Sequence, residues 1–340
     1  MASAKQTEPE VRPIDRFRRD LDALIEPGEI IGLAVSGGPD SLALLLLAAE
    51  ARPLQVEAAT IDHGLRPESR AEAEMVAKIC ERLGVPHRIL SVTWDKKPAT
   101  AIQERARVMR YRLLGEWVRE RGLTALLTAH HVDDQAETFL MRLARGAGVK
   151  GLAGMRRFSG TPGSAFALVR PLLGWRHSEL EAVCAAAEVE PAQDPSNEDE
   201  QFERVRVRKA LAGAGWLDPA AVAESAFHLA EADGALHWAT DLEWRRAVSQ
   251  TGGEIVYKPT DAPREIRRRI IRRAILALAT EGGGAELRGR EIDQILTALR
   301  TGRRATLRGV LCVGGPDWHF ARAPARRAAN ASAEVSAIEG

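Results

Sequence analysis

The chain has 340 residues, of which 45% are hydrophobic and 28% are charged, and its formal net charge is +1. This length predicts two domains, and this composition predicts a globular protein that buries a sizeable core. Residues 1–10 are polar, and no apolar run approaches the roughly 20 residues that a membrane span needs. We therefore expect a cytoplasmic protein without a membrane association.

Cysteine spacing and charge distribution narrow the class further. The three cysteines, Cys80, Cys184 and Cys312, are far apart and form no CxxC pair, which argues against a zinc site and a disulfide framework. Basic residues outnumber acidic ones over residues 201–330, whereas acidic residues outnumber basic ones elsewhere. This asymmetry favours a polyanionic partner, with a solvated basic surface as the alternative.

The most informative stretch is an apolar run at residues 30–35 that ends in Ser36-Gly37-Gly38-Pro39-Asp40-Ser41. The two glycines leave space for a ligand against the backbone, and the start of the following helix favours an anion. The serines add hydroxyl donors, and Asp40 adds a carboxylate suited to a metal ion. The stretch is neither a Walker loop nor a dinucleotide fingerprint. It predicts a phosphate-binding loop, with a plain strand-to-helix turn as the alternative.

Strands and helices alternate through the first half of the chain. Apolar strands are expected at residues 30–35, 54–61, 87–92, 123–128 and 166–169, and helices at 14–25, 41–51, 68–83, 100–121 and 132–145. This alternation predicts an α/β fold of Rossmann type, an open parallel five-stranded sheet with helices on both faces. Ligands of such sheets bind at the carboxyl ends of the strands.

Polar clusters follow three of these strands. Besides the loop at 36–41, Asp62 and His63 follow the second strand, and residues 130–138 follow the fourth. In the last cluster, Asp134 and Glu137 lie one helical turn apart, opposite the apolar side of their helix. Two carboxylates therefore share one face near a helix start. The structural alternatives are an N-cap at position 133 or 134 and ordinary surface histidines at 130 and 131.

The helix at 100–121 carries Arg107 and Arg110 one turn apart, with Tyr111 beside them. A solvated arginine face is the default interpretation of such a run. The polar clusters above favour a phosphate-facing role.

Beyond residue 151 the pattern is looser. Residues 158–165 are expected to form a hairpin loop, and Arg204, Arg206 and Arg208 alternate in a stretch that fits either a strand or a helix end. Residues 213–218 are the expected boundary between a catalytic domain and a smaller, basic, mainly helical domain. The expected ranges are 1–28 for an N-terminal tail and helix, 29–215 and 219–322 for the two domains, and 323–340 for a disordered tail.

Three helices and a closing strand pair are expected in the second domain, the helices at 219–248, from Pro263, and at 290–299. The helix from Pro263 carries Arg268, Arg269 and Arg272 largely outside its apolar stripe. Such a surface is suited to phosphates.

The glycine loop resembles the SGGxDS loop of the PP-loop ATP pyrophosphatases, which bind ATP and cleave between its α and β phosphates. The order of the remaining motifs is similar to that in tRNA(Ile)-lysidine synthetases. These motifs are Asp62-His63-Gly64-Leu65-Arg66, Ala106-Arg107 with Arg110-Tyr111, residues 130–138, Arg170-Pro171-Leu172-Leu173 and Asp194-Pro195-Ser196-Asn197. The resemblance is specific over residues 28–210 and extends over 220–322 in pattern only.

The resemblance implies a ligase that adenylates the C2 oxygen of the wobble cytidine in CAU-anticodon isoleucine tRNA and lets free L-lysine displace AMP. ATP would lie on Ser36, Gly37, Gly38, Pro39, Asp40 and Ser41, near Asp62 and His63, and Asp40 would bind Mg²⁺. Asp134 and Glu137 would hold the lysine amine or the metal, and Arg107 would position phosphates or the intermediate. Arg204, Arg206, Arg208, Arg268, Arg269 and Arg272 would bind tRNA. A homodimer is compatible with the sequence.

Two departures from the family pattern are visible. The family usually has Arg-Asn-x-Ile-Arg where this chain has Arg204-Val205-Arg206-Val207-Arg208, so no role of that Asn carries over. The further C-terminal domain of longer members is also not expected here.

Alternative functions share the loop. A tRNA thiolase would normally need paired cysteines, and an amidating synthetase would normally lack a basic second domain. A catalytically idle tRNA-binding protein would not need Asp40, Asp134 and Glu137.

Overall fold

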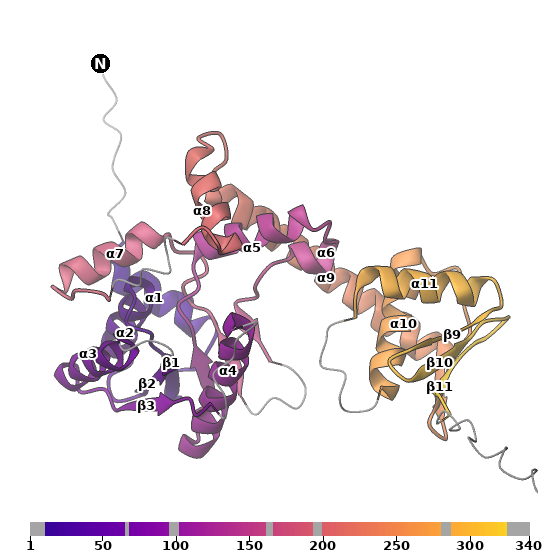
Figure 1. The fold of residues 1–340 in the computed structure, drawn as a ribbon, viewed down its shortest axis with the longest axis horizontal. Coiled ribbons are helices and arrows are strands. Elements are labelled where there is room, and N and C mark those ends of the chain that lie inside the picture. The colour runs from indigo at the N-terminus through magenta and orange to yellow at the C-terminus, as the bar shows by residue number, and fades with distance from the viewer. Residues whose placement is uncertain are drawn as a thin grey trace, which may run out of the picture. The chain divides into compact units, whose positions relative to one another are not determined.

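The computed structural model describes residues 11–64, 68–94, 102–160, 166–192, 199–279 and 287–324. The chain divides into two compact units, Met1–Glu231 and Ala232–Gly340, and Figure 1 labels the elements of both. The division falls inside helix α9 (Pro219–Ala247). The expected boundary at 213–218 forms the connection between α8 (Glu203–Gly213) and α9. The motif at 194–197 and most of the expected tail lie outside the described residues.

The first unit contains a six-stranded sheet in the order β3-β2-β1-β4-β6-β5. Its strands are β1 (Ile31–Ala34), β2 (Val56–Asp62), β3 (His87–Ser91), β4 (Ala125–Leu127), β5 (Phe158–Ser159) and β6 (Ala167–Val169). The five strands β3, β2, β1, β4 and β6 run parallel to one another, as predicted. The sixth, β5, pairs antiparallel with β6 at residues expected to lie in a loop. The sheet therefore has one edge strand more than the sequence pattern indicated.

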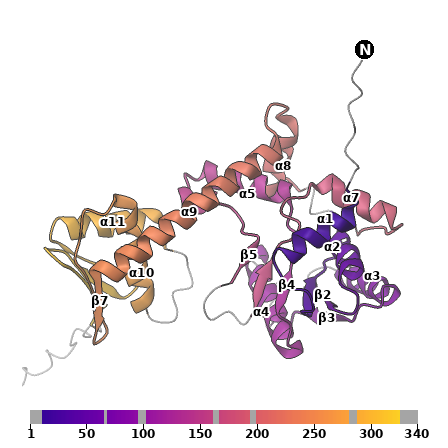
Figure 2. The same ribbon diagram turned by 180° about the vertical axis from the view of Figure 1, so that it is seen from behind.

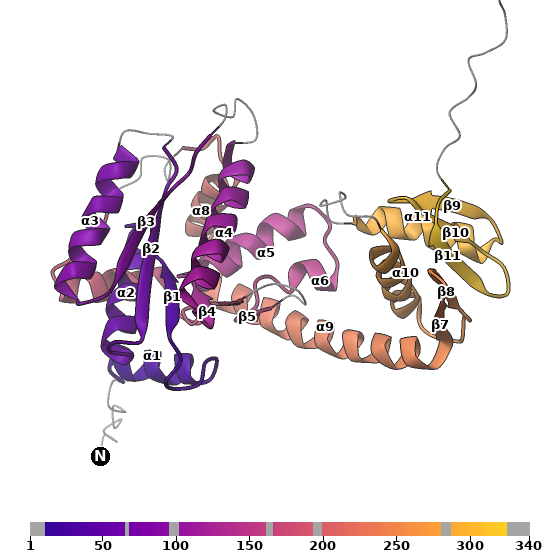
Figure 3. The same cartoon turned by 90° about the horizontal axis from the view of Figure 1, so that it is seen from below.

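Helices cover both faces of this sheet, as predicted, and Figure 3 shows α3 (Glu68–Arg82) and α4 (Ile102–Arg121) on opposite sides of the strands. The core on one face joins α1 (Pro13–Asp22), α2 (Pro39–Ala51), α3 and α7 (His177–Ala186). On the other face, Leu114 and Trp117 of α4 pack on β1 and β4. A Cβ at Gly32 would lie 2.8 Å from the Trp117 ring, so this close approach requires glycine in β1.

The head of α5 (Val132–Ala144) follows β4, and the short α6 (Val149–Leu152) follows α5. Helix α8 packs on α5. The stretch that contains Arg204, Arg206 and Arg208, which fitted either a strand or a helix end, is therefore helical. In an α-helix Arg204 and Arg208 lie on one face, whereas Arg206 lies on another.

The second unit combines helices with an antiparallel sheet in the order β7-β8-β11-β10-β9. Its elements are β7 (Val248–Thr251), β8 (Glu254–Tyr257), α10 (Arg264–Leu278), α11 (Gly289–Arg300), β9 (Arg304–Leu307), β10 (Val310–Val313) and β11 (Trp318–Arg322), several of which Figure 2 shows from behind. The three helices are present as expected, and the sheet adds three strands to the expected pair. Ile270, Leu296 and Phe320 lie in its core. None of the described helices is long and apolar enough to cross a membrane.

Candidate active site

The loop between β1 and α2 is held together by Ser41. The Ser41 hydroxyl oxygen accepts hydrogen bonds from the backbone N–H groups of Ser36 (3.1 Å) and Gly37 (3.2 Å), and it donates one to the carbonyl of Gly38 (3.0 Å). Gly37 has φ +92°, the left-handed region that favours glycine. The Ser41 side chain, expected as a ligand donor, is therefore buried and engaged within the loop. The loop therefore offers an anion its backbone, the exposed Ser36 and the first turn of α2.

Asp40, in that first turn, lies between two imidazoles. Its Oδ1 is 2.7 Å from Nδ1 of His177, and its Oδ2 is 3.5 Å from Nε2 of His131. Burial opposes ionisation, but the hydrogen bonds with both histidines lower the pKa of Asp40 to about 2. Asp40 is therefore an ionised carboxylate at the mouth of the loop. A ligand atom from each of these three residues lies within 4.8 Å of the others, close enough for them to share a cation.

His131 lies in a ring of carboxylates and begins α5 as its N-cap. Its Nδ1 is 3.4 Å from the Asp133 carboxylate, and its Nε2 is 3.5 Å from that of Asp134. Burial opposes protonation, but Asp133 and Asp40 raise the pKa of His131 to about 10. The backbone N–H of Asp133 also approaches Nδ1, at 3.2 Å. In this N-cap hydrogen bond Nδ1 is the acceptor, and Nε2 faces the carboxylates of Asp40 and Asp134.

The two aspartates at the head of α5 have separate structural contacts. Asp134 accepts the backbone N–H of its N-cap residue at 3.3 Å, so neither aspartate is itself the N-cap. Asp133 accepts the backbone N–H of His177 at 2.8 Å and pairs with Arg176 at 3.1 Å. Burial opposes ionisation of Asp133, but its hydrogen bonds with His131 and His177 hold its pKa well below the usual range. Asp133 therefore fixes the start of α7 beside α5.

Glu137 is buried beneath two arginines of α8. Its side chain is 1% exposed, and its Oε1 accepts a hydrogen bond from Nε of Arg208 at 2.6 Å. Nε of Arg204 lies 3.0 Å from the other oxygen, and Arg204 also reaches Asp134 at 3.9 Å. Arg206 instead donates to backbone carbonyls of residues 200 and 201. Two of the arginines expected to bind tRNA are thus paired with an acid expected to bind lysine.

A second group of cations lies around the ends of β2, β4 and β6. The Arg107 guanidinium stacks on Tyr111 at 5.0 Å. Arg170 is 7% exposed, and its Nη1 donates to the carbonyl of Arg156 and the hydroxyl of Ser159, whereas its buried Nε has no hydrogen-bond partner among the described residues. Burial lowers the pKa of both Arg110 and Arg170. In the described part of the chain no carboxylate lies within ion-pair distance of these three arginines. Burial and, to a smaller extent, Arg110 lower the pKa of His63 to about 4, so its imidazole adds no positive charge to this group.

A cavity of about 440 Å³ opens beside α5 and α8. Asp133 and Glu137 line it together with Arg176, Arg208 and Trp216. Asp133 contacts His131, which contacts Asp40, so a chain of side-chain contacts connects the cavity to the loop between β1 and α2. The size of the cavity is that of a small-molecule site.

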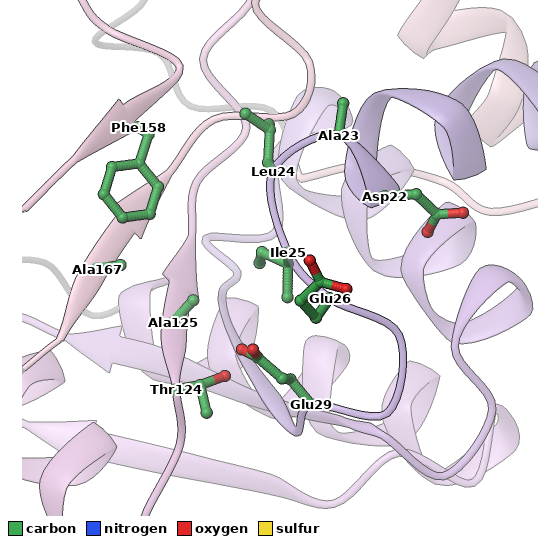
Figure 4. A pocket seen from close by; sticks show the side chains of 10 residues that line it. All are labelled: Asp22, Ala23, Leu24, Ile25, Glu26, Glu29, Thr124, Ala125, Phe158 and Ala167. Carbon is green, nitrogen blue, oxygen red and sulfur yellow. The ribbon is translucent and has the colours of Figure 1, made fainter.

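A second cavity, of about 350 Å³, lies at the amino ends of β4 and β6, and Figure 4 shows Phe158 and the acids Asp22, Glu26 and Glu29 around it. Because ligands of parallel sheets bind at the carboxyl ends, the cavity beside α5 and α8 is the candidate site.

The remaining expected site residues make contacts of their own. Asp62 accepts hydrogen bonds from the N–H of Gly64 (2.9 Å) and the hydroxyl of Ser69, so it organises the turn after β2. In the second unit, Arg268 pairs with Glu265 and Asp293, and Arg269 pairs with Glu265 and Asp233. Arg272 has no ion pair within the described residues. Two of the three α10 arginines are thus neutralised by neighbouring acids.

Sequence reasoning missed Arg176, His177 and Trp216, and it weighed His131 as an ordinary surface residue. Arg176 and His177 follow β6 at the same edge of the sheet as the other clusters. The sequence analysis looked for polar residues after the first, second and fourth expected strands. The same search after the fifth expected strand, residues 166–169, would have found Arg176 and His177.

Comparison with known proteins gives the family. Residues 13–214 match the family described as a PP-loop domain. The tRNA(Ile)-lysidine synthase of Novosphingobium aromaticivorans is 48% identical over 92% of this chain and 94% of its own length. The tRNA(Ile)-lysidine synthase of Zymomonas mobilis is 41% identical over 88% of this chain and 90% of its own length. The U34-tRNA thiolase NcsA from Methanococcus maripaludis shares the fold, with TM-score 0.54 and 18% identity over 64% of this chain and 78% of its own. The chain therefore belongs to the tRNA(Ile)-lysidine synthase family of PP-loop proteins.

Proposed function

We propose that the protein is a carbon–nitrogen ligase that joins the ε-amine of free L-lysine to C2 of the wobble cytidine in CAU-anticodon isoleucine tRNA. The observation that carries this proposal is the contact chain from Asp40 through His131 to Asp133 and Asp134. It joins a phosphate-binding loop to carboxylates that can bind an amine. The names of the relatives, which cover nearly the whole chain, support the same reaction.

In the first step the C2 oxygen of the cytidine attacks the α-phosphorus of ATP, and pyrophosphate leaves. The loop backbone and the first turn of α2 would hold the phosphates. Asp40 suits Mg²⁺ as an ionised, partly exposed oxygen ligand, and the ion would neutralise charge on the leaving pyrophosphate. Arg107, Arg110 and Arg170 lack carboxylate partners in the described part of the chain, so they would stabilise the anionic groups.

In the second step the lysine amine attacks C2, the bond from C2 to oxygen breaks, and AMP leaves with that oxygen. The amine must first lose a proton, because its ordinary pKa is about 10.4. Asp134 is the better candidate to hold the amine and accept the proton, since its contacts with neighbouring groups are 3.3 to 3.9 Å long. Glu137 is already bound by Arg208 at 2.6 Å. We therefore assign Glu137 to positioning and Asp134 to the amine.

Sulfur transfer, the chemistry of a tRNA thiolase, is not favoured. All three cysteines are buried and unpaired. Burial raises the pKa of Cys80 and Cys312 to about 12 and, aided by Asp40, that of Cys184 to about 11. Such thiols are poor nucleophiles at neutral pH, because the thiolate is the reactive form.

The test measures AMP and pyrophosphate release with ATP, lysine and a CAU-anticodon isoleucine tRNA transcript, each omitted in turn. We expect AMP release to require all three, and methionine tRNA with the same anticodon to be inactive. Asp134→Asn should lose lysine-dependent AMP release, whereas Glu120→Gln, an exposed acid on α4, should behave as wild type. Full turnover by Asp134→Asn would refute its role, and AMP release without lysine would refute the ligation.

A further inference from the structure

We infer that Trp216 is the platform on which the wobble base stacks when it enters the cavity beside α5 and α8. The inference rests on the proposed function and adds a residue that recognises the nucleobase. It starts from the position of the indole, which lines the cavity while remaining 85% exposed.

The exposure of Trp216 is imposed by an anchored turn. The next residue, Leu217, packs against the cluster of Ala136, Leu211 and Val222, and its N–H donates to the carbonyl of Ala214 at 2.9 Å. The residue after that, Asp218, pairs with Arg176 at 3.2 Å. The backbone that follows Trp216 is therefore fixed both to α5 and to the start of α7. A large flat ring held in water by a fixed backbone suits a ligand with a flat face.

The polar groups of the cavity match the edge of cytosine. Cytosine presents an amino group that donates, and carboxylates accept from it. Its ring nitrogen accepts, and guanidinium groups donate. The cavity offers a carboxylate at Asp133 and guanidinium groups at Arg176 and Arg208, whereas Glu137 is already paired with two arginines. Each guanidinium has five N–H donors, so the ion pairs that these residues already make leave donors for a base.

The location fits the reaction. A base stacked on Trp216 would lie in the cavity that Asp133 joins, through His131, to Asp40 of the phosphate loop. The C2 oxygen must meet the α-phosphorus of ATP at that loop. Enzymes that modify a base take it out of its stack and hold it between aromatic or apolar side chains. The alternatives to the wobble base on the indole face are the lysine ammonium, through a cation–π contact, and the adenine of ATP.

The binding experiment uses a CAU anticodon stem-loop and the same stem-loop with an abasic wobble position. We expect wild-type protein to bind the intact stem-loop roughly tenfold or more tightly than the abasic one, since one stacked base contributes about that much. Trp216→Ala should bind both about equally, and Trp216→Phe should restore most of the preference. The matched control is Trp238→Ala, another exposed tryptophan, which should keep the wild-type preference. Equal preference in wild type and Trp216→Ala would overturn the inference.

Steady-state kinetics separates the possible occupants. Trp216→Ala should lower kcat/KM for tRNA roughly tenfold and leave KM for lysine and ATP within about twofold. A rise in KM for lysine alone would assign the indole to the ammonium, and a rise for ATP alone would assign it to adenine. Either result overturns the inference while lysine ligation stands. Failure of the wild-type protein to incorporate lysine would instead refute the proposed function, and the abasic comparison would still report the base contact.

Discussion

Replacing Glu137 by Gln tests the packing of α8 on α5. The substitution keeps the shape of a side chain that is 1% exposed but removes the charge that faces Arg204 and Arg208. Breaking a fully buried ion pair costs about 3–5 kcal/mol. Here the two arginine side chains are 42% and 48% exposed, so water recovers part of that cost. We expect the free energy of unfolding of the first unit to fall by about 2 kcal/mol.

Urea denaturation followed by circular dichroism measures this change, and thermal denaturation should show a Tm lower by about 4–8 °C. Arg206→Ala is the matched control, because Arg206 is on the same helix and, among the described residues, donates to two backbone carbonyls and to no carboxylate. It should change stability by less than about 0.5 kcal/mol. The double variant with Arg208→Ala should be less destabilised than the sum of the single changes, by about 1 kcal/mol or more. Wild-type stability of Glu137→Gln, or strict additivity in the double variant, would refute the ion-pair reasoning.

Three further predictions concern the loop and the second unit. Gly37→Ala should destabilise the protein by about 1–3 kcal/mol in urea denaturation, because φ is +92° there, whereas Gly38→Ala at φ −74° should not. Arg268→Ala should lower the Tm and change tRNA affinity little, because the Arg268 charge is already paired with acids of the protein. Arg303→Ala, at an exposed position, should weaken the salt dependence of tRNA binding. Burial and Glu243 raise the pKa of Tyr257 to about 12, so its contribution to stability should be present below pH 10 and lost toward pH 12. Tyr257→Phe should lack this part of the pH dependence in denaturation measured across that range.

The parallel sheet was predictable because its evidence is local. Apolar runs such as residues 30–35 end at glycine or proline and alternate with helical periodicity, and this determines a fold class. The strand β5 was not predictable in this way, because a strand of two residues is too short to show an alternating pattern. Phe158 is in a strand only because it pairs with β6. The tight turn between β1 and α2 was likewise predictable from its glycines. Ser41 is buried and holds the loop together instead of facing a ligand, and the sequence does not show this burial.

The partners of charged residues were the least predictable part of the site. The sequence shows that Arg204 and Arg208 are basic, which is compatible with binding tRNA. Only the packing of α8 on α5 brings them to Glu137. In the same way, His177 joins Asp40 across 137 positions of sequence. Local patterns identify which residues carry chemistry, whereas the contacts that set their charge and availability come from tertiary structure.

The mass of the wobble nucleoside shows directly whether the protein adds lysine to tRNA. CAU-anticodon isoleucine tRNA is incubated with the protein, ATP and lysine, then digested to nucleosides and analysed by mass spectrometry. We expect the wobble cytidine to gain one lysine with the loss of one water, and isotopically labelled lysine to shift this mass by its label. A wobble cytidine of unchanged mass, or one that has exchanged oxygen for sulfur, would contradict the proposed function.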